Sequence, residues 1–320
     1  MEPVCTCTGS RASAAAATFT FRWPGSRPSS SPSSSSTISR SSTPTSTRRP
    51  RRSPEPVPEL PEVETVRRVL ETELTGRTIT EIVVRTPTFY RPPPRAALTG
   101  LIGKTVTGFS RRGKFLSLLA GERSLVLHLG MSGRLTLTDR PAGNRSVKHC
   151  RFEIGFGGKT LRFVDPRRFG RVGGPLPKFG PEPLDPAFTP DFLKAAFQGR
   201  KAAIKALLMD QGVLAGLGNI YATEALFRAG IRPSRPAGRL RRAELESLHE
   251  AIRFVIREGI RLRGSTLDDE AFLDPYGKPG GFQNRVCIYG RREGACGHSL
   301  AKTKRPIASR SAVYCPVCQK

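Results

Sequence analysis

The sequence contains no run of 18 apolar residues, so it lacks the continuous hydrophobic stretch that a membrane-spanning helix needs. Acidic residues are also scarce, since 26 Asp and Glu stand against 53 Lys and Arg, for a formal charge of +27. Residues 1–57 hold 8 Arg and 2 Glu, so the other 263 residues carry +21 of this charge. A body this basic indicates a polyanionic partner, nucleic acid first and an anionic membrane surface second.

Cysteine is sparse except near the end of the chain. The seven cysteines include Cys5 and Cys7 in a serine-rich segment, and four of the other five lie within residues 287–318. Such a cluster favours a metal site in a reducing compartment over a framework of disulfides.

Residues 1–57 include the low-complexity tract "SSSPSSSSTISRSSTPTST", which has no apolar periodicity. A segment of this composition buries too little surface to offset its ordering entropy, so we expect it to be disordered. Its Arg- and Ser-rich, acid-poor character is that of an organellar transit peptide. Two alternatives remain: upstream sequence translated from a wrongly chosen start, and a genuine basic tail that adds nonspecific DNA affinity.

From residue 58 the pattern becomes globular. Apolar residues recur at helical spacing in "PEVETVRRVLETEL", and Pro61 is tolerated in the first turn. Runs rich in β-forming residues follow in "TITEIVVRT", "KFLSLLA", "SLVLHLGMSGRLTLT" and "CRFEIGFGGKTLRFV". The pair Gly157–Gly158 predicts a tight hairpin. Residues 58–185 are therefore expected to form an antiparallel β-sandwich with a leading helix.

After "GGPLPKFGPEPLDP" the apolar residues recur with the helical period of about 3.6 residues. This pattern is found in "DFLKAAF", "AAIKALLMD", "NIYATEALFRAG" and "RRAELESLHEAIRFVIREGIRLR". We expect a helical domain over residues 186–282 and a short zinc-stabilised hairpin over residues 283–320. The predicted class is thus a multidomain α+β protein without internal repeats.

Eight motifs follow one another along the chain: "PELPEVETVRR", "RRGKFL", "HLGMSGRL", "DPRRFG", "GPEPL", "GVLAGLGNIYATEALFRAGI", "GKPGGF" and "CPVCQK". Their order is similar to that of the formamidopyrimidine-DNA glycosylase family. The chain resembles this family from Pro58 to Lys320, and eight motifs in register are far more specific than any one of them. The resemblance implies a sandwich, a helix–two-turn–helix module and a zinc ribbon.

The resemblance also implies a catalytic set. The family's nucleophile is the α-amine of an N-terminal proline, which matches Pro58 here. An internal proline nitrogen is a tertiary amide, so this chemistry requires Pro58 to be the first residue. Val57 stands where the family has its initiator methionine, and we expect it to be the true start, later removed. Glu59 matches the proton donor and Glu62 a second buried glutamate, whereas an ordinary helix N-terminus would also favour both acids.

Two further catalytic residues are implied by position. Lys114 in "RRGKFL" matches a lysine that assists β-elimination and contacts phosphate. Arg310, five residues before Cys315, matches the arginine that grips the phosphate of the flipped nucleotide and aids δ-elimination.

The motifs "LGMSG" and "DPRRFG" resemble two loops that fill the space left when a base is extruded from duplex DNA. Met131 and Phe169 would act as wedges, and Arg167 would hydrogen-bond the orphaned cytosine. His149 matches a DNA-contacting position, and an ordinary strand histidine is the alternative.

The helix–two-turn–helix segment supplies expected phosphate contacts. Asn219 opens a helix whose free N–H groups can hold phosphate, and Arg200, Lys201 and Lys205 add positive charge nearby. The motif "GKPGGF" resembles the flexible loop that closes over the everted purine.

The C-terminal ribbon departs from the family pattern of two C-x₂-C pairs. Cys296, Cys315 and Cys318 are present, but the first pair is replaced by "ACGHSL". His298 is an acceptable zinc ligand at an unusual spacing, and Cys287 is the other candidate for the fourth position. A ribbon that holds no metal is a further alternative.

The resemblance implies a bifunctional DNA glycosylase and abasic-site lyase for oxidised purines such as 8-oxoguanine and formamidopyrimidines. Strand release would follow β,δ-elimination, with one structural zinc ion and no redox cofactor. Two alternatives are an endonuclease VIII-like enzyme for oxidised pyrimidines and a non-catalytic damage binder that retains residues 1–57. We expect a monomer that binds damaged double-stranded DNA inside the cell: in a bacterial cytoplasm, or in an organelle if residues 1–57 are a transit segment.

Overall fold

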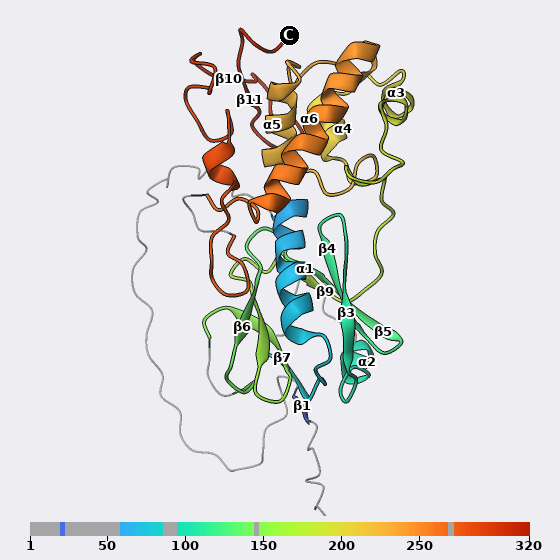
Figure 1. The fold of residues 1–320 in the computed structure, drawn as a ribbon, viewed down its shortest axis with the longest axis vertical. Coiled ribbons are helices and arrows are strands. Elements are labelled where there is room, and N and C mark those ends of the chain that lie inside the picture. Colours follow the sequence, from blue (N-terminus) through green and yellow to red (C-terminus); the bar gives the residue numbers. More distant parts are fainter. Residues whose placement is uncertain (1–19, 23–57, 86–94, 144–146, 268–271) are drawn as a thin grey trace, which may run out of the picture.

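The computed structural model describes residues 20–22, 58–85, 95–143, 147–267 and 272–320. Two sheets, a group of helices and a small C-terminal ribbon follow one another along the chain (Figure 1). This is the predicted class, a sandwich with a leading helix followed by a helical module and a hairpin. Among the helices in the described ranges, none is both long enough and apolar enough to cross a membrane.

The sandwich consists of a five-stranded sheet in the order β1-β2-β7-β8-β6 and a four-stranded sheet in the order β3-β4-β5-β9. The five-stranded sheet contains β1 (Thr20–Arg22), β2 (Glu81–Val84), β6 (Arg134–Thr138), β7 (Cys150–Gly155) and β8 (Thr160–Val164). The four-stranded sheet contains β3 (Val106–Arg112), β4 (Phe115–Ala120), β5 (Arg123–His128) and β9 (Arg171–Val172), and α2 (Arg95–Thr99) precedes β3.

The hairpin predicted at Gly157–Gly158 is confirmed. It joins β7 to β8 in antiparallel register, and both glycines have positive φ. Within residues 1–57, Thr20–Arg22 pair with β2 in parallel register. The expected disorder of this segment stays a prediction, and its other residues lie outside the described residues.

Helix α1 (Leu60–Leu74) connects the sandwich to the helical module (Figure 1). Its later apolar residues, from Val63 to Leu74, pack in the core between the two sheets, whereas Leu60 packs in the core of the helical module. The Leu60 N–H donates to the Gly216 carbonyl at 3.1 Å, and a β-carbon on Gly216 would lie 2.5 Å from Leu60 Cδ1. Only glycine permits this approach, so the N-terminal end of α1 is fixed at the junction of the two cores.

The helical module contains α3 (Pro190–Phe197), α4 (Ile204–Met209), α5 (Asn219–Arg228) and α6 (Arg242–Arg261), with short 3₁₀ turns η1 (Ala237–Arg239) and η2 (Phe282–Arg285). Helix α6 buries the apolar face predicted for it, including Leu245, Leu248, Ile252, Val255 and Ile256. The ribbon that follows contains β10 (Ala301–Lys302) and β11 (Val313–Tyr314), paired antiparallel. The predicted domain limits at residues 185 and 282 remain predictions.

Candidate functional site

Glu59 lies in a buried site where α1 meets the N-terminus of α5. The residue is 2 % exposed, and its carboxylate accepts hydrogen bonds from the backbone N–H groups of Gly218 at 2.7 Å, Ile220 at 2.8 Å and Tyr221 at 3.4 Å. Burial raises the pKa of Glu59 to about 7, although Lys114 and the N–H donors act in the opposite direction. This carboxyl group is therefore poised to hold or release a proton near neutral pH.

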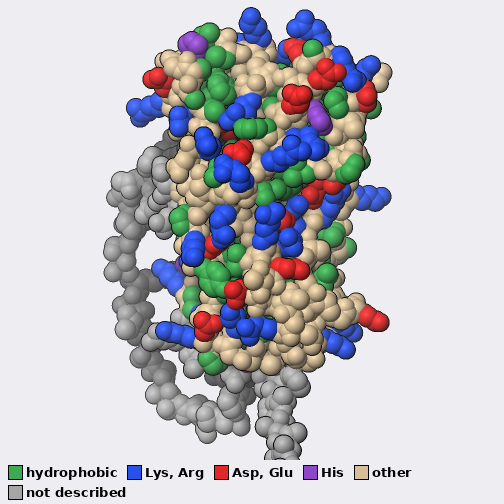
Figure 2. Space-filling view, in the orientation of Figure 1, with side chains coloured by type: hydrophobic (Ala, Val, Ile, Leu, Met, Phe, Trp, Pro, Cys, Tyr) green, Lys and Arg blue, Asp and Glu red, His purple; other side chains and the backbone are tan. Residues whose placement is uncertain are grey.

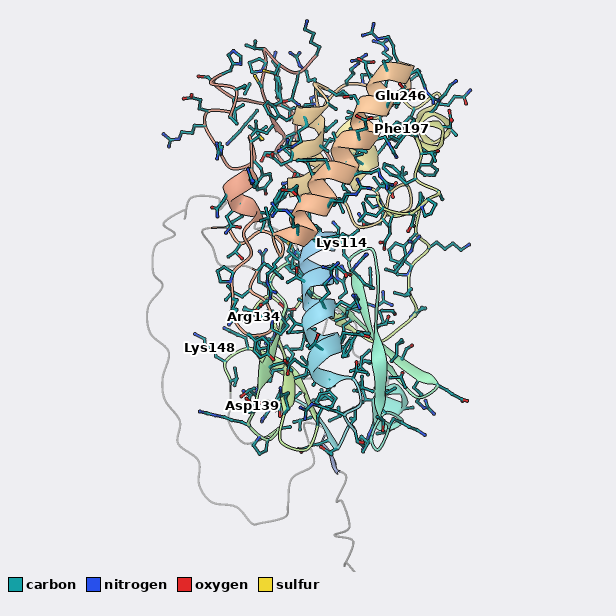
Figure 3. The ribbon with its side chains drawn as sticks, in the orientation of Figure 1. Lys114, Arg134, Asp139, Lys148, Phe197 and Glu246 are labelled. Atoms are coloured by element: carbon teal, nitrogen blue, oxygen red, sulfur yellow. The ribbon has the colours of Figure 1, made fainter. Side chains whose placement is uncertain are left out.

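Lys114 enters the same site from the turn between β3 and β4 (Figure 3). A β-carbon on Gly218 would lie 2.6 Å from Lys114 Nζ and 2.4 Å from Glu59 Cδ, so both groups lie against the same glycine. Burial lowers the pKa of Lys114 and Arg310 lowers it further, whereas Glu59 and Glu62 raise it.

The turn that carries Lys114 is held by ion pairs. Arg111 bonds Glu182 at 2.7 Å and Glu64 at 3.1 Å, and the Gly113 N–H donates to Glu182 at 2.6 Å. Arg111, one of the two arginines that precede Lys114 in the sequence, therefore holds the turn in place.

Glu62 joins three elements beneath the site. It accepts hydrogen bonds from the Tyr221 hydroxyl at 2.8 Å, the Ser265 N–H at 2.7 Å and the Glu59 N–H at 2.9 Å. Burial raises the pKa of Glu62, and its hydrogen bonds act against that effect. Pro58 precedes this pair of acids and is also buried.

Lys205 and Arg310 complete the cluster of cations. The Lys205 amine is buried and donates to the Thr223 hydroxyl at 2.8 Å. Burial lowers the pKa of Lys205 to about 8, with Arg310 acting in the same direction and Glu59 against it. Arg310 thus acts on the amines of both lysines. The sequence predicted Lys205 only as nearby charge, because the burial of one lysine depends on packing that no motif records.

Asn219 is the first residue of α5, as the sequence predicted. The N–H groups of Gly218, Ile220 and Tyr221 at this end of the helix donate to Glu59, so the expectation that they are free to hold phosphate is wrong. Its Nδ2 donates to the Tyr289 hydroxyl at 3.2 Å. Its Oδ1 is buried and accepts no hydrogen bond from the described part of the chain.

The two predicted wedge loops lie against each other. Asp165 accepts hydrogen bonds from the Ser132 hydroxyl and the Gly170 N–H, both at 2.7 Å. A β-carbon on Gly130 would lie 2.6 Å from the Phe169 carbonyl oxygen. This contact brings the loop of Met131 beside the loop of Arg167 and Phe169.

Phe169 remains accessible in this arrangement. Its side chain is 44 % exposed, and the Arg167 guanidinium lies 5.3 Å from the ring centroid. His149 is exposed, and its carbonyl accepts the Asp165 N–H at 3.0 Å, so it lies beside the same loop. The four predicted DNA-contacting residues of the sandwich are therefore grouped.

His128 is a site residue that sequence analysis missed, although it opens the motif "HLGMSGRL". Its Nδ1 accepts the Gly130 N–H at 3.2 Å, and its ring packs 4.4 Å from the Phe115 ring. Burial, followed by Lys114 and Arg171, lowers the pKa of His128 to about 4, so the imidazole is neutral at physiological pH. His128 therefore contacts both the loop of Met131 and strand β4.

Arg200 and Lys201 do not join the buried cluster. Both are exposed on the connection between α3 and α4. Figure 2 shows Lys and Arg side chains spread over the sandwich and the helical module on one face, with fewer Asp and Glu among them.

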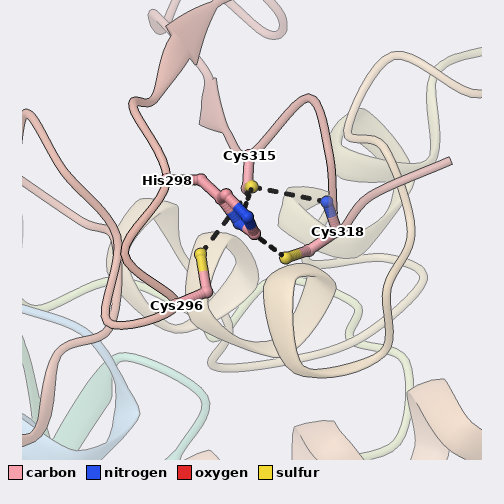
Figure 4. A group of neighbouring side chains, drawn as sticks. All are labelled: Cys296, His298, Cys315 and Cys318. Atoms are coloured by element: carbon pink, nitrogen blue, oxygen red, sulfur yellow. Dashed lines mark hydrogen bonds between the residues drawn. The ribbon is translucent and has the colours of Figure 1, made fainter.

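Cys296, His298, Cys315 and Cys318 form a group whose ligand atoms all lie within 4.8 Å of one another (Figure 4). The sulfurs of Cys296 and Cys315 are 3.7 Å apart, and His298 Nδ1 lies 3.5 Å from Cys318 Sγ. A tetrahedral ion with bonds of about 2.3 Å has ligand atoms about 3.8 Å apart, so this set fits one. Cys287 lies outside the group, because its N–H donates to Glu224 and its Sγ contacts Arg228.

A sandwich followed by a helix–two-turn–helix module, with buried amines beside carboxyl groups and an exposed Phe169 loop, is the arrangement of a DNA glycosylase. The formamidopyrimidine-DNA glycosylase N-terminal domain model matches residues 57–172, and the corresponding H2TH domain model matches residues 179–271. The chain belongs to the formamidopyrimidine-DNA glycosylase family.

Curated relatives agree with this assignment. The formamidopyrimidine-DNA glycosylase of Halorhodospira halophila is 43 % identical over 278 residues, which cover 82 % of this chain and 100 % of the relative. That of Thermus thermophilus is also 43 % identical, over 82 % of this chain and 98 % of the relative.

Solved structures agree as well. The crystal structure of the MutM (Fpg) protein from Thermus thermophilus has a TM-score of 0.71 at 40 % identity, and it covers 82 % of this chain and 98 % of its own. A Lactococcus lactis Fpg variant in complex with DNA containing Fapy-dG has a TM-score of 0.74 at 32 % identity, over 82 % of this chain and 100 % of its own.

Proposed function

We propose that the protein removes oxidised purines, 8-oxoguanine and formamidopyrimidines, from duplex DNA and then cleaves the strand by β,δ-elimination. The relatives named above support the substrate class, since one of them is bound to DNA containing Fapy-dG. The observation that carries the proposal is the Glu59 carboxyl group, with its pKa raised to about 7, beside the buried amine of Lys114.

The nucleophile in this proposal is the α-amine of Pro58, which requires that no residue precede it. The neutral secondary amine attacks C1′ of the damaged nucleotide, forming the N–C1′ bond while the bond to the base breaks. The base leaves with a proton, and the sugar ring opens to give an iminium ion. Loss of a proton from C2′ then expels the 3′ phosphate, and a second elimination expels the 5′ phosphate.

Glu59 is proposed to protonate the sugar ring oxygen. Because burial raises its pKa to about 7, this carboxyl group can carry the proton near neutral pH. Lys114 assists the β-elimination and contacts phosphate, and Arg310 holds the phosphate of the flipped nucleotide and aids the δ-elimination. Glu62 keeps Glu59 and the N-terminal turn of α1 in place.

The wedge loops are proposed to support the duplex after base extrusion. Met131 and Phe169 fill the vacated stack, and Arg167 hydrogen-bonds the orphaned cytosine. His149, Arg200, Lys201 and Asn219 contact the DNA backbone, which positions the enzyme without selecting a sequence.

The Cys/His group is proposed to hold one structural zinc ion. Three thiolates and one imidazole are a common structural zinc set, and the ion would supply folding energy to the ribbon that carries Arg310. Cys296, His298, Cys315 and Cys318 are the proposed ligands.

A direct test compares two substrates with protein that begins at Pro58. Duplexes carrying 8-oxoguanine opposite cytosine, or thymine glycol opposite adenine, are incubated with enzyme and sodium borohydride. We expect incision and a covalent adduct with the 8-oxoguanine duplex. Preferential cleavage of thymine glycol would instead indicate an endonuclease VIII-like enzyme, and binding without any adduct would indicate a non-catalytic damage binder.

A further inference from the structure

Gln319 is a fully buried amide beside the metal group, and both ends of its side chain are hydrogen-bonded. It is 0 % exposed. Its Oε1 accepts the Cys315 N–H at 2.8 Å, and its Nε2 donates to the Ile231 carbonyl at 2.7 Å. One neutral side chain thus connects the backbone of a metal ligand to the segment that follows α5.

The turn from Cys315 to Cys318 rests on that segment. Within the turn, the Cys318 N–H lies 3.3 Å from Cys315 Sγ and the Gln319 N–H donates to the Cys315 carbonyl at 3.1 Å. The last residue then pairs with the chain after α5, because the Lys320 N–H donates to Gly230 and the Arg232 N–H donates to Lys320, both at 2.9 Å.

The other half of the metal group is attached to α5 at a different point. Glu224 is fully buried, and its carboxylate accepts the N–H groups of Cys287, Ile288 and Tyr289 at 2.7 to 3.0 Å. This segment leads into Cys296 and His298. The strands β10 and β11, which lie between the two halves, contain only two residues each. So short a hairpin cannot fix the relative position of the four ligands alone.

We propose that Gln319 is a positioning residue of the metal centre, holding the Cys315–Cys318 turn against the end of α5. Retention of the ion then depends on a side chain that does not coordinate it. Position 319 requires a side chain that both accepts and donates a hydrogen bond. Without it, the buried Cys315 N–H or the Ile231 carbonyl would lose its partner and carry a desolvation penalty. The inference rests on the zinc centre proposed above.

The test uses the zinc-loaded full chain and the chromogenic chelator 4-(2-pyridylazo)resorcinol, which reports zinc release by absorbance. Gln319→Met keeps the length of the side chain and removes both hydrogen bonds. We expect it to release zinc at least ~10-fold faster than the wild type. The matched control is Val317→Ser, in the same turn, where the side chain is 59 % exposed. This control should stay within about twofold of the wild type.

A second measurement uses only the wild-type protein, and it tests the role of Gln319 even if the Gln319→Met variant does not fold. Hydrogen exchange is compared between zinc-loaded and zinc-stripped wild-type protein. Stripping should speed exchange at the Cys315 amide, which donates to Gln319 Oε1, but not at Val255 inside α6. Zinc release from the variant at the wild-type rate, or unchanged exchange at Cys315, overturns the role of Gln319. A wild-type chain that binds no zinc overturns the metal centre itself.

Discussion

Glu59 lies so close to Gly218 that a β-carbon at residue 218 would fall 2.4 Å from Glu59 Cδ. The Gly218 N–H also donates to this carboxylate at 2.7 Å. The glycine therefore lets the start of α5 and the N-terminus of α1 share one buried site, in which a carboxyl group and an amine lie side by side.

Gly218→Ala should displace Glu59 and Lys114 from that site. We expect base excision to fall by ~100-fold or more, because small displacements of reacting groups carry large rate penalties. Single-turnover excision of 8-oxoguanine measures the effect. The control is Gly155→Ala, whose added carbon would meet its neighbours at ordinary distances of 3.4 Å and above. Equal rates for both variants would show that Glu59 does not need this position.

The raised pKa of Glu59 makes folding depend on pH in a defined direction. The folded state holds this proton up to a pKa of about 7, whereas the unfolded state releases it near 4.5. The contribution of Glu59 to the free energy of unfolding therefore falls as pH rises from 4.5 to about 7, by about 3 kcal/mol, and is constant above that range.

Glu59→Gln removes this titration. Relative to the wild type, the variant should gain stability across the same pH range, as measured by urea unfolding at several pH values. A constant difference between the two proteins from pH 4.5 to 7.5 would contradict the raised pKa.

The turn that presents Arg310 places two non-glycine residues in the left-handed region. Ala308 has φ 48° and Ser309 has φ 60°, between the mutually bonded Ile307 and Arg310. Ser309→Gly should therefore stabilise the ribbon by about 1 kcal/mol, since glycine takes positive φ without a steric penalty. Denaturant unfolding of the zinc-loaded protein measures this, with Ser311→Gly as the control outside the strained pair. A loss of stability in Ser309→Gly would contradict the strain.

Binding to undamaged duplex should weaken steeply with salt, because the body of the protein carries +21 and each phosphate contact releases counterions. Replacing Arg200 and Lys201 by alanine should reduce the slope of log affinity against log salt by about 2. Fluorescence anisotropy from dilute to physiological salt gives the slope. Lys104→Ala, at the far end of the sandwich beside α2, should leave it unchanged. An unaltered slope in the double variant would show that neither Arg200 nor Lys201 contacts the DNA backbone.

The sequence predicted most of the site because its motifs are contiguous. The motif "PELPEVE" carries Glu59 and Glu62 on one helix turn, and "LGMSG" and "DPRRFG" each carry a whole loop. The contact between Gly130 and Phe169 then brings those two loops together. Residues that a contiguous motif carries could therefore be predicted without a structure.

What could not be predicted depends on packing between distant segments. Lys205 looks like any helix lysine until Thr223 and the surrounding core bury its amine. Spacing alone allows either His298 or Cys287 as the fourth metal ligand. In the structure His298 lies in the group, whereas the Cys287 N–H donates to Glu224 on α5. The short strand β1 lies in the alternating aromatic run "TFTFRW", which the serine- and arginine-rich composition of the surrounding segment obscured.

The nucleophile is tested most directly by locating the covalent bond that borohydride traps between the protein and damaged DNA. Protein that begins at Pro58 is reacted with an 8-oxoguanine duplex, reduced, digested and analysed by tandem mass spectrometry. The account predicts that the sugar remnant lies on the α-nitrogen of Pro58, and that a chain with residues still ahead of Pro58 gives no adduct. A remnant on Lys114 or Lys205, or equal trapping by the extended chain, would contradict it.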